Sequence, residues 1–175
     1  MKNIFYKDWV ILSLSYYQII KKQELIFELF FPLTISTVCG IVYYWINKVE
    51  IALHALSNIL PTLASILIGF TIMLITILLT SNGPNIERLK ETKYKKKLAG
   101  KEISLYQVLH ICFCHLLIVE VLLLLSILFF LFLKGIGMPV WVLLVFLIIE
   151  GFMTLSILFS IVRSITNLYF AFYQN

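Results

Sequence analysis

Charged residues are scarce in this sequence. They make up only 13% of its 175 residues, whereas 61% of the residues are apolar. A typical soluble domain is about 25% charged and about 45–50% apolar, so the composition excludes a water-soluble globular protein. The length allows about four membrane spans of ~20 residues with short connections, and it leaves no room for a soluble catalytic domain.

Cysteine is also scarce, and the motifs of common enzymes are missing. The three cysteines are an odd number without framework spacing, and all lie in apolar stretches, which argues against a disulfide scaffold. The chain contains no glycine-rich phosphate loop, nucleophile elbow, HExxH motif or paired CxxC. We therefore expect neither enzymatic activity nor a cofactor.

One short stretch does contain residue types that bind soft metals: His110, Cys112, Cys114 and His115. On a helix, with 100° per residue, His110 shares a face with Cys114, while Cys112 and His115 share another. Each face then offers at most two ligands, too few for a closed zinc site. We expect no metal within one chain and interpret these residues as core or interface polar groups; a metal held between subunits is the alternative.

Four apolar runs predict the architecture. They cover residues 26–46, a dense core at 61–80, the stretch 105–133, and residues 139–162. We predict an all-α polytopic membrane protein whose four transmembrane helices occupy residues 26–162. Pro61 either begins the second span or kinks a longer helix, because proline has no N–H to donate.

The two flanks of this region are rich in aromatic residues. Residues 1–24 have an amphipathic helical period, with one side formed by Phe5, Trp9, Leu12, Tyr16 and Ile19. Lys7 and Asp8 interrupt the apolar run that a signal peptide needs, so we expect this segment to be retained. It is predicted to lie in the membrane interface as a helix parallel to the bilayer; packing on protein as a cytoplasmic helix is the alternative. The tail, residues 163–175, is expected to lie at the interface too.

Residues 81–104 form the largest polar feature. This segment carries three acidic and seven basic residues, for a net charge of +4, and the basic ones are Arg88, Lys90, Lys93, Lys95, Lys96, Lys97 and Lys101. The spacings Glu87 to Lys90 and Glu91 to Lys95 favour a short basic helix, which Gly100 would close. We expect this segment to be a solvated surface that docks a partner or contacts lipid, rather than one that binds nucleic acid directly.

The basic residues also predict the orientation in the membrane. With four spans, one side collects 12 Lys and Arg residues, and the other receives only Lys48 and Lys134. The positive-inside rule then assigns both termini and the basic segment to the cytoplasm. The predicted location is the bacterial inner membrane.

Two acidic residues lie near the middle of predicted spans. Glu120 and Glu150 are both roughly 17–21 Å from the outer turn at 1.5 Å per residue, and no Lys or Arg is available at that depth. Two ionised carboxylates there would lose hydration and repel each other, so we expect at least one to carry a proton. The pair is either a proton-responsive element or a hydrogen-bonding link between helices.

The second span carries a stripe of small and hydroxyl residues: Asn58, Thr62, Ser65, Gly69, Thr76 and Thr80. Their spacing approaches the 3.5-residue repeat of a left-handed helix seam, and Ser65 and Gly69 form a small-xxx-small pair. We predict helix packing through Ser65, Gly69 and Thr76. The stripe either packs on its own neighbours or faces the axis of an oligomer, where it would line a narrow polar path.

The order of these features resembles the membrane subunit of the Kiwa bacterial anti-phage system. The similarity lies in the run Leu63-Ala64-Ser65-Ile66-Leu67-Ile68-Gly69-Phe70, in Thr80-Ser81-Asn82, and in Gly100-Lys101-Glu102-Ile103 after the lysine-rich segment. The resemblance implies a homo-oligomeric membrane sensor that recruits a soluble DNA-binding effector during infection. It also implies that the basic segment and the amino-terminal helix are docking surfaces.

The expected function is therefore that of a non-enzymatic sensor or assembly subunit that recruits a cytoplasmic protein partner. The alternative is a small oligomeric ion channel or a holin-like pore, in which the acidic residues and the hydroxyl stripe would line a conduit. A small multidrug-type transporter is a third possibility, although that family is much shorter and has its acidic residue in the first span.

Overall fold

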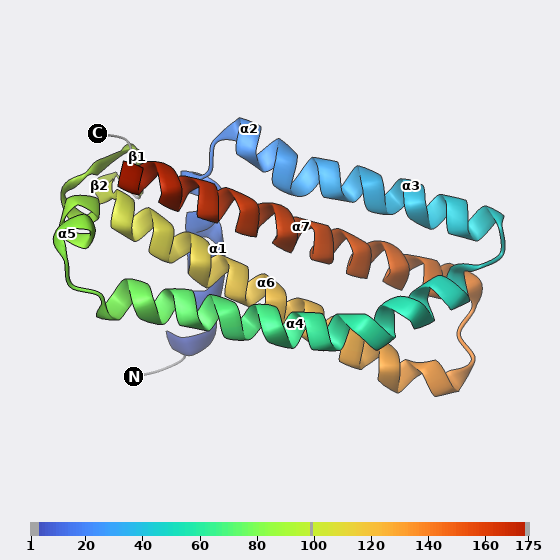
Figure 1. Cartoon of the computed structure of the whole chain (residues 1–175). Helices are drawn as coiled ribbons and strands as arrows, with labels where there is room; N and C mark the ends of the chain where they lie inside the picture. Colours follow the sequence, from blue (N-terminus) through green and yellow to red (C-terminus); the bar gives the residue numbers. More distant parts are fainter. Residues whose placement is uncertain (1–3, 99, 174–175) are drawn as a thin grey trace.

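The computed structural model describes residues 4–98 and 100–173, and it is almost entirely helical (Figure 1). Four helices are long and apolar enough to cross a membrane: Lys22–Trp45, Val49–Thr80, Leu105–Leu133 and Val140–Tyr169. The shortest has 24 residues, or about 36 Å at 1.5 Å per residue, which exceeds the ~30 Å hydrocarbon core. The predicted all-α fold with four membrane-length helices is confirmed.

The four helices form two tightly packed pairs, and one helix of each pair also contacts the other pair. Helix α3 (Phe31–Trp45) packs along α7 (Val140–Tyr173), α4 (Val49–Thr80) packs along α6 (Leu105–Leu133), and α6 also contacts α7. The α3–α7 contact is close at Gly40, where an added Cβ would lie 2.7 Å from Ile148 Cγ1. Small residues therefore allow the close helix approach that packing in lipid requires.

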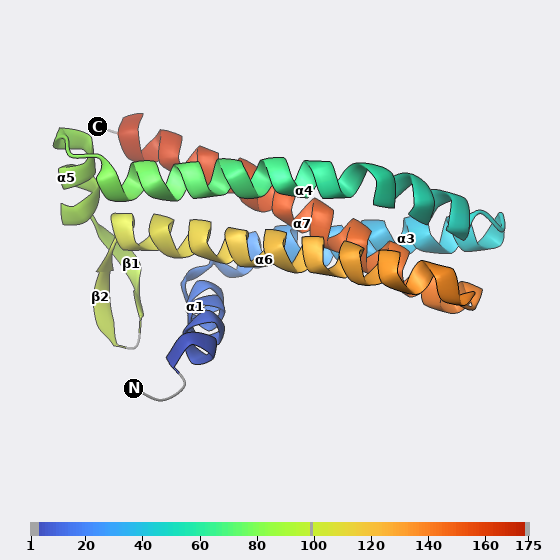
Figure 2. The same ribbon diagram turned by 90° about the horizontal axis from the view of Figure 1, so that it is seen from below.

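The two ends of the bundle differ in composition. The basic segment and the last turns of α7 lie at one end, and helix α1 (Ile4–Ile19) crosses the bundle near it (Figures 1 and 2). We call this the basic end. The α3–α4 and α6–α7 connections lie at the opposite end, the turn end, together with Lys48 and Lys134. The basic segment and the segments next to both termini thus share one end.

The first span starts earlier than predicted and contains a π-helical turn. Helix α2 (Lys22–Leu25) leads through the π-turn η1 (Ile26–Phe30) into α3. Pro32 follows directly and has no N–H for the carbonyl of Glu28, four residues earlier. Ser156 Oγ on α7 donates to that carbonyl at 2.9 Å. The irregular turn and the cross-helix bond together accommodate the proline.

Pro61 lies inside α4 rather than at its start, so the second of the two predicted possibilities holds. The helix extends twelve residues before it, from Val49. Figure 1 shows α4 changing direction in its first half. Proline bends a helix because its ring clashes with the preceding turn and one backbone hydrogen bond is lost.

The hydroxyl stripe of α4 does not pack on the rest of the chain. Ser65, Gly69 and Thr76 are exposed, and nothing lies within 4 Å of a Cβ added at Gly69. Ser65 Oγ donates instead to the Pro61 carbonyl of its own helix at 2.8 Å. Of the two alternatives, packing on neighbours within the chain does not hold, because α4 packs through a different face. That face buries Leu53, Ser57, Leu60, Ala64, Thr71 and Leu78.

The basic segment is only partly helical. Helix α5 (Pro84–Glu91) confirms the predicted short helix, but strands β1 (Lys93–Leu98) and β2 (Lys101–Ser104) form an antiparallel hairpin after it. The predicted helix therefore ends at Glu91 and does not continue through Lys95 to Gly100. Tyr94, Lys96 and Leu98 face inward at a period of two, which suits a strand, and Gly100 turns the chain with a φ of +81°.

The fourth span does not end near residue 162. Helix α7 continues without a break to Tyr173, and residues 152–173 contain no glycine or proline that would stop it. The first part of the predicted tail, residues 163–173, is thus a continuation of the span. Other predicted residues fall outside the described residues or side chains: Lys2, Phe5, Lys7, Phe170, Phe172 and Tyr173.

Candidate functional site

A buried ionic cluster lies near the basic end, at the point where four helical segments meet. Arg163 on α7 is its centre. Arg163 Nε lies 2.8 Å from Glu28 Oε1 on η1, and Arg163 Nη1 lies 3.4 Å from Glu24 Oε2 on α2. Glu28 is only 4% exposed. We call Tyr16, Glu24, Glu28, Cys112 and Arg163 the Arg163 cluster.

Tyr16 connects helix α1 to this cluster. Its hydroxyl accepts a hydrogen bond from Arg163 Nη2 at 2.8 Å and donates one to Glu28 Oε2. The guanidinium also lies over the ring, with Arg163 Cζ 5.3 Å from its centroid. Burial raises the pKa of the Tyr16 phenol well above its ordinary value. The phenol therefore remains a donor over the physiological pH range.

Helix α6 contributes two of the residues that were predicted from the sequence. Cys112 Sγ accepts a contact from Arg163 Nη2 at 3.9 Å. The His115 ring stacks on Tyr16, with centroids 3.8 Å apart and planes 19° from parallel. The cluster and its neighbours therefore connect α1, the start of the first span, α6 and α7, which are widely separated in the sequence.

The sequence reasoning missed the Arg163 cluster. Arg163 was counted only among the 12 basic residues that predict the orientation, and Glu28 was given no role of its own. The available signal was that two opposite charges lie at the ends of apolar runs on the same side, Glu28 near the start of the first run and Arg163 directly after the fourth. A charge in that position is costly unless it has a partner, so the two are expected to pair.

Glu120 and Glu150 have a different environment. Both are completely buried. Thr71 Oγ1 donates to Glu120 Oε1 at 2.9 Å. Glu120 Oε2 and both carboxyl oxygens of Glu150 have no hydrogen-bond partner among the described residues. Both side chains belong to the packed interior of the bundle, and the expectation that at least one is protonated stays a prediction.

The histidines and cysteines of α6 separate as helical geometry predicts. Cys114 Sγ lies 3.8 Å from His110 Nδ1 on one face, whereas Cys112 and His115 contact other partners. Over residues 4–98 and 100–173, no group of three or more His, Cys, Asp or Glu residues is placed to hold a metal ion.

The hairpin places its lysines on two faces. Lys96 faces inward, and its Nζ donates to the backbone carbonyl of Ile20 at the end of α1. Lys93, Lys95 and Lys97 face outward. Together with the other exposed basic residues they form what we call the basic platform: Arg88, Lys90, Lys93, Lys95, Lys97 and Lys101.

Two members of the platform make defined contacts. Lys93 Nζ lies 2.7 Å from Glu102 Oε2 across the hairpin. This pairing raises the pKa of Lys93 and lowers that of Glu102. Lys90 Nζ lies 5.4 Å from the centroid of the Tyr106 ring, within cation–π range. The contact between Lys90 and Tyr106 thus connects the platform to the start of α6.

Comparisons with protein-family models, with curated proteins and with solved structures find no match for this chain.

Proposed function

We propose that this protein is a non-enzymatic membrane sensor or assembly subunit that recruits a cytoplasmic protein through the basic platform. Its location is the bacterial inner membrane, with the basic end in the cytoplasm and the protein assembled as a homo-oligomer. The resemblance to the Kiwa membrane subunit suggests anti-phage defence as the setting. The partner that fits is a protein with an acidic surface, because the platform presents closely spaced positive charges.

The observation that carries this proposal is a continuous set of contacts from the spans to the platform. Arg163 on α7 holds Tyr16 on α1. The end of α1 holds Lys96 of the hairpin, and Tyr94 and Leu98 pack against Tyr16, Ile19 and Ile20. A displacement of α7 relative to α1 would therefore change the position of the hairpin.

A sensor requires an element with two states that the signal biases, and the Arg163 cluster with α1 and the hairpin is the element to which we assign this role. In the first state the Arg163 cluster is closed and α1 holds the hairpin. In the second, the stimulus separates α7 from η1, the ion pair opens, and the hairpin is released from α1. The partner would bind one of these states more tightly than the other.

Copurification tests the recruitment. The bait is the tagged protein in native membranes, and the readout is the amount of the protein encoded next to it. Lys95→Glu combined with Lys97→Glu is expected to reduce copurification more than about tenfold, since charge reversal at a complementary surface repels the partner. Lys48→Glu combined with Lys134→Glu, at the turn end, is the matched control and should bind like the wild type.

Unchanged copurification by the Lys95/Lys97 variant, at normal membrane insertion, would remove the docking role of the platform. Lys96→Met tests the coupling separately. It removes the bond to Ile20 but no outward charge, so it should change how recruitment responds to the stimulus.

A pore is the second candidate, and the exposed hydroxyl stripe of α4 is the feature that favours it. Such a stripe, if it faces other copies across an axis, could line a polar path. Flux from liposomes that contain only the purified protein discriminates between the two. Conductance that disappears with Thr76→Val would favour the pore, and tight liposomes would favour the recruiting subunit.

A further inference from the structure

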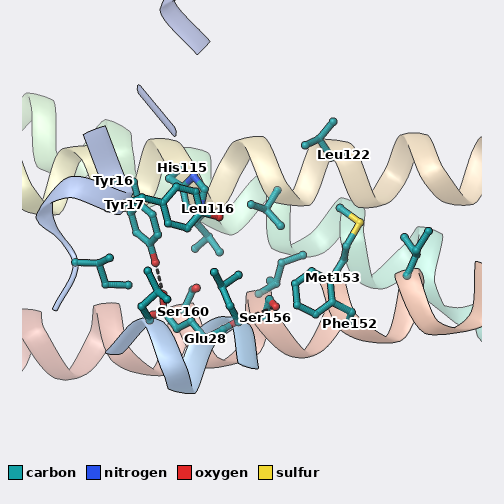
Figure 3. A pocket seen from close by; sticks show the side chains of 16 residues that line it. Tyr16, Tyr17, Glu28, His115, Leu116, Leu122, Phe152, Met153, Ser156 and Ser160 are labelled. Atoms are coloured by element: carbon teal, nitrogen blue, oxygen red, sulfur yellow. Dashed lines mark hydrogen bonds between the residues drawn. The ribbon is translucent and has the colours of Figure 1, made fainter. Parts of the chain in front are cut away.

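A cavity of about 350 Å³ lies next to the Arg163 cluster, between α1, the first span, α6 and α7 (Figure 3). Its volume falls in the range of small-molecule and cofactor pockets. The wall is mostly apolar, with Leu116, Val119, Leu122, Phe152, Met153 and Ile157 among the lining residues. Tyr16 and Glu28 of the Arg163 cluster contribute to its wall, but the apolar part of the cavity has no role in the proposed function.

Most polar groups lie toward one end of the cavity, and Ser156 lies between the two ends. Figure 3 shows Tyr16, His115 and Glu28 at one end, and Leu122, Phe152 and Met153 toward the other. Leu122 is seven residues beyond His115 on α6, so the apolar part extends about 10 Å along that helix. The cavity therefore has the shape and polarity of an amphiphile.

His115 lines this cavity and has one unused hydrogen-bonding position. It is only 8% exposed, and its Nδ1 atom has no partner among the described residues. Buried polar atoms are nearly always satisfied, so an unsatisfied one indicates an absent partner. A neutral imidazole has one donor and one acceptor nitrogen. In the tautomer that carries its proton on Nδ1, this nitrogen can donate a hydrogen bond to a carbonyl oxygen.

The cavity continues toward the lipid-facing surface of the first span. Leu25, Leu29 and Phe152 line both the cavity and a neighbouring open groove, which Ile26, Phe30 and Leu33 complete. Ile26, Phe30 and Leu33 are exposed side chains of a membrane-length helix. A hydrocarbon chain can therefore enter sideways from the bilayer.

We propose that this cavity binds one acyl chain of a membrane phospholipid, with its ester carbonyl at His115. A helix of a second copy is too large, since one turn about 10 Å wide and 5.4 Å long fills about 400 Å³. A flexible chain fits a narrow apolar space without leaving backbone polar groups unpaired. This inference stands without the recruitment role.

Photo-crosslinking tests the position of the chain. The protein is placed in liposomes of phosphatidylglycerol that contain a trace of the same lipid with a diazirine in its acyl chain. Peptides that contain residues 115–122 and 149–157 should be labelled above other lipid-facing peptides. Leu122→Trp fills the apolar end of the cavity and should reduce this labelling severalfold. Leu125→Trp is the matched control: Leu122 and Leu125 are both exposed on α6, but only Leu122 lines the cavity.

The role of His115 is tested with two forms of the probe, ester-linked and ether-linked. The wild type should retain the ester-linked lipid about fivefold better, because one hydrogen bond distinguishes the two. His115→Phe keeps a ring to stack on Tyr16 and should reduce the ratio to about one. An unchanged ratio would remove His115 from the proposal.

Two further outcomes would overturn the acyl-chain site. One is labelling that is equal in the wild type and in Leu122→Trp. The other is labelling by a diazirine fatty acid where the phospholipid probe gives none, because the occupant would then be a free acid. Copurification of the neighbouring protein is measured on the same variants, so a failure of recruitment is separable from a failure of lipid binding.

Discussion

The protein buries three glutamates within its spans, and it treats them in two different ways. Glu28, near the basic end, contacts Arg163 and the Tyr16 hydroxyl. Glu120 and Glu150 lie deeper and have no cationic partner in the described structure; one hydroxyl, that of Thr71, binds Glu120. A buried glutamate thus has an arginine partner near the basic end, whereas the two deeper glutamates have none among the described residues.

The difference shows what each region contributes. A buried ion pair has little net stabilising effect relative to apolar packing, but the loss of one partner is costly. The Arg163 cluster therefore fixes the relative positions of α1, the first span and α7. Thr71 on α4 links to Glu120 on α6 through one hydrogen bond between helices, and protonation of Glu120 and Glu150 stays a prediction.

The largest effect is expected from Arg163→Met. This change leaves the buried Glu28 carboxylate unpaired and should reduce the free energy of unfolding by ~3–5 kcal/mol. Denaturation of the detergent-solubilised protein measures it. Arg163→Lys retains the charge but not the fork geometry and should be intermediate. A loss below ~1 kcal/mol for Arg163→Met would show that the cluster does not organise this end.

Thr71→Val should have a smaller effect in the second region. It leaves Glu120 Oε1 without its donor, and single hydrogen bonds between membrane helices contribute about 0.6 to 2 kcal/mol. Ser65→Val on the exposed face of the same helix is the control and should be close to neutral. If the two variants are equally stable, the bond between Thr71 and Glu120 contributes nothing measurable.

Glu150→Gln should change stability still less, by about 0.5 kcal/mol or under, because glutamine has nearly the shape of a protonated glutamate and keeps its hydrogen-bonding capacity. Glu28→Gln removes a charge from an ion pair and should cost several times more. Equal stability of Glu28→Gln and Glu150→Gln would show that the two regions do not differ in how they stabilise a buried glutamate. A functional loss in Glu150→Gln at unchanged stability would instead identify a titrating switch.

The smallest effect is expected outside the membrane, at the exposed pair of Lys93 and Glu102. The pairing holds the pKa of Glu102 below its ordinary value of 4.5. The contribution of this pair to the hairpin is therefore present above the ordinary value and is lost as the pH falls through the lowered one. NMR titration of the Glu102 carboxyl should give a midpoint below 4.5, and Lys93→Met should return it to the ordinary range.

Individual residues show how far sequence reasoning extends. The third span was predicted to lie within residues 105–133, and α6 occupies that whole range. A long apolar run between polar segments can cross a bilayer only as a helix or as part of a closed barrel. The hairpin was mistaken for helix because the spacing from Glu91 to Lys95 suits a helix as well as a loop. Its strands depend on the packing of Tyr94 and Leu98 against α1, and no local pattern encodes that contact.

The sequence alone determined the number of membrane-length helices and the concentration of charge at one end, because length, hydropathy and charge are local properties that a bilayer sorts by depth. The tertiary structure decided which face of α4 is buried, which glutamate obtains an arginine, and where a cavity remains. Those outcomes depend on contacts between residues as far apart as Tyr16 and Arg163, and such pairings are fixed only when the helices pack together.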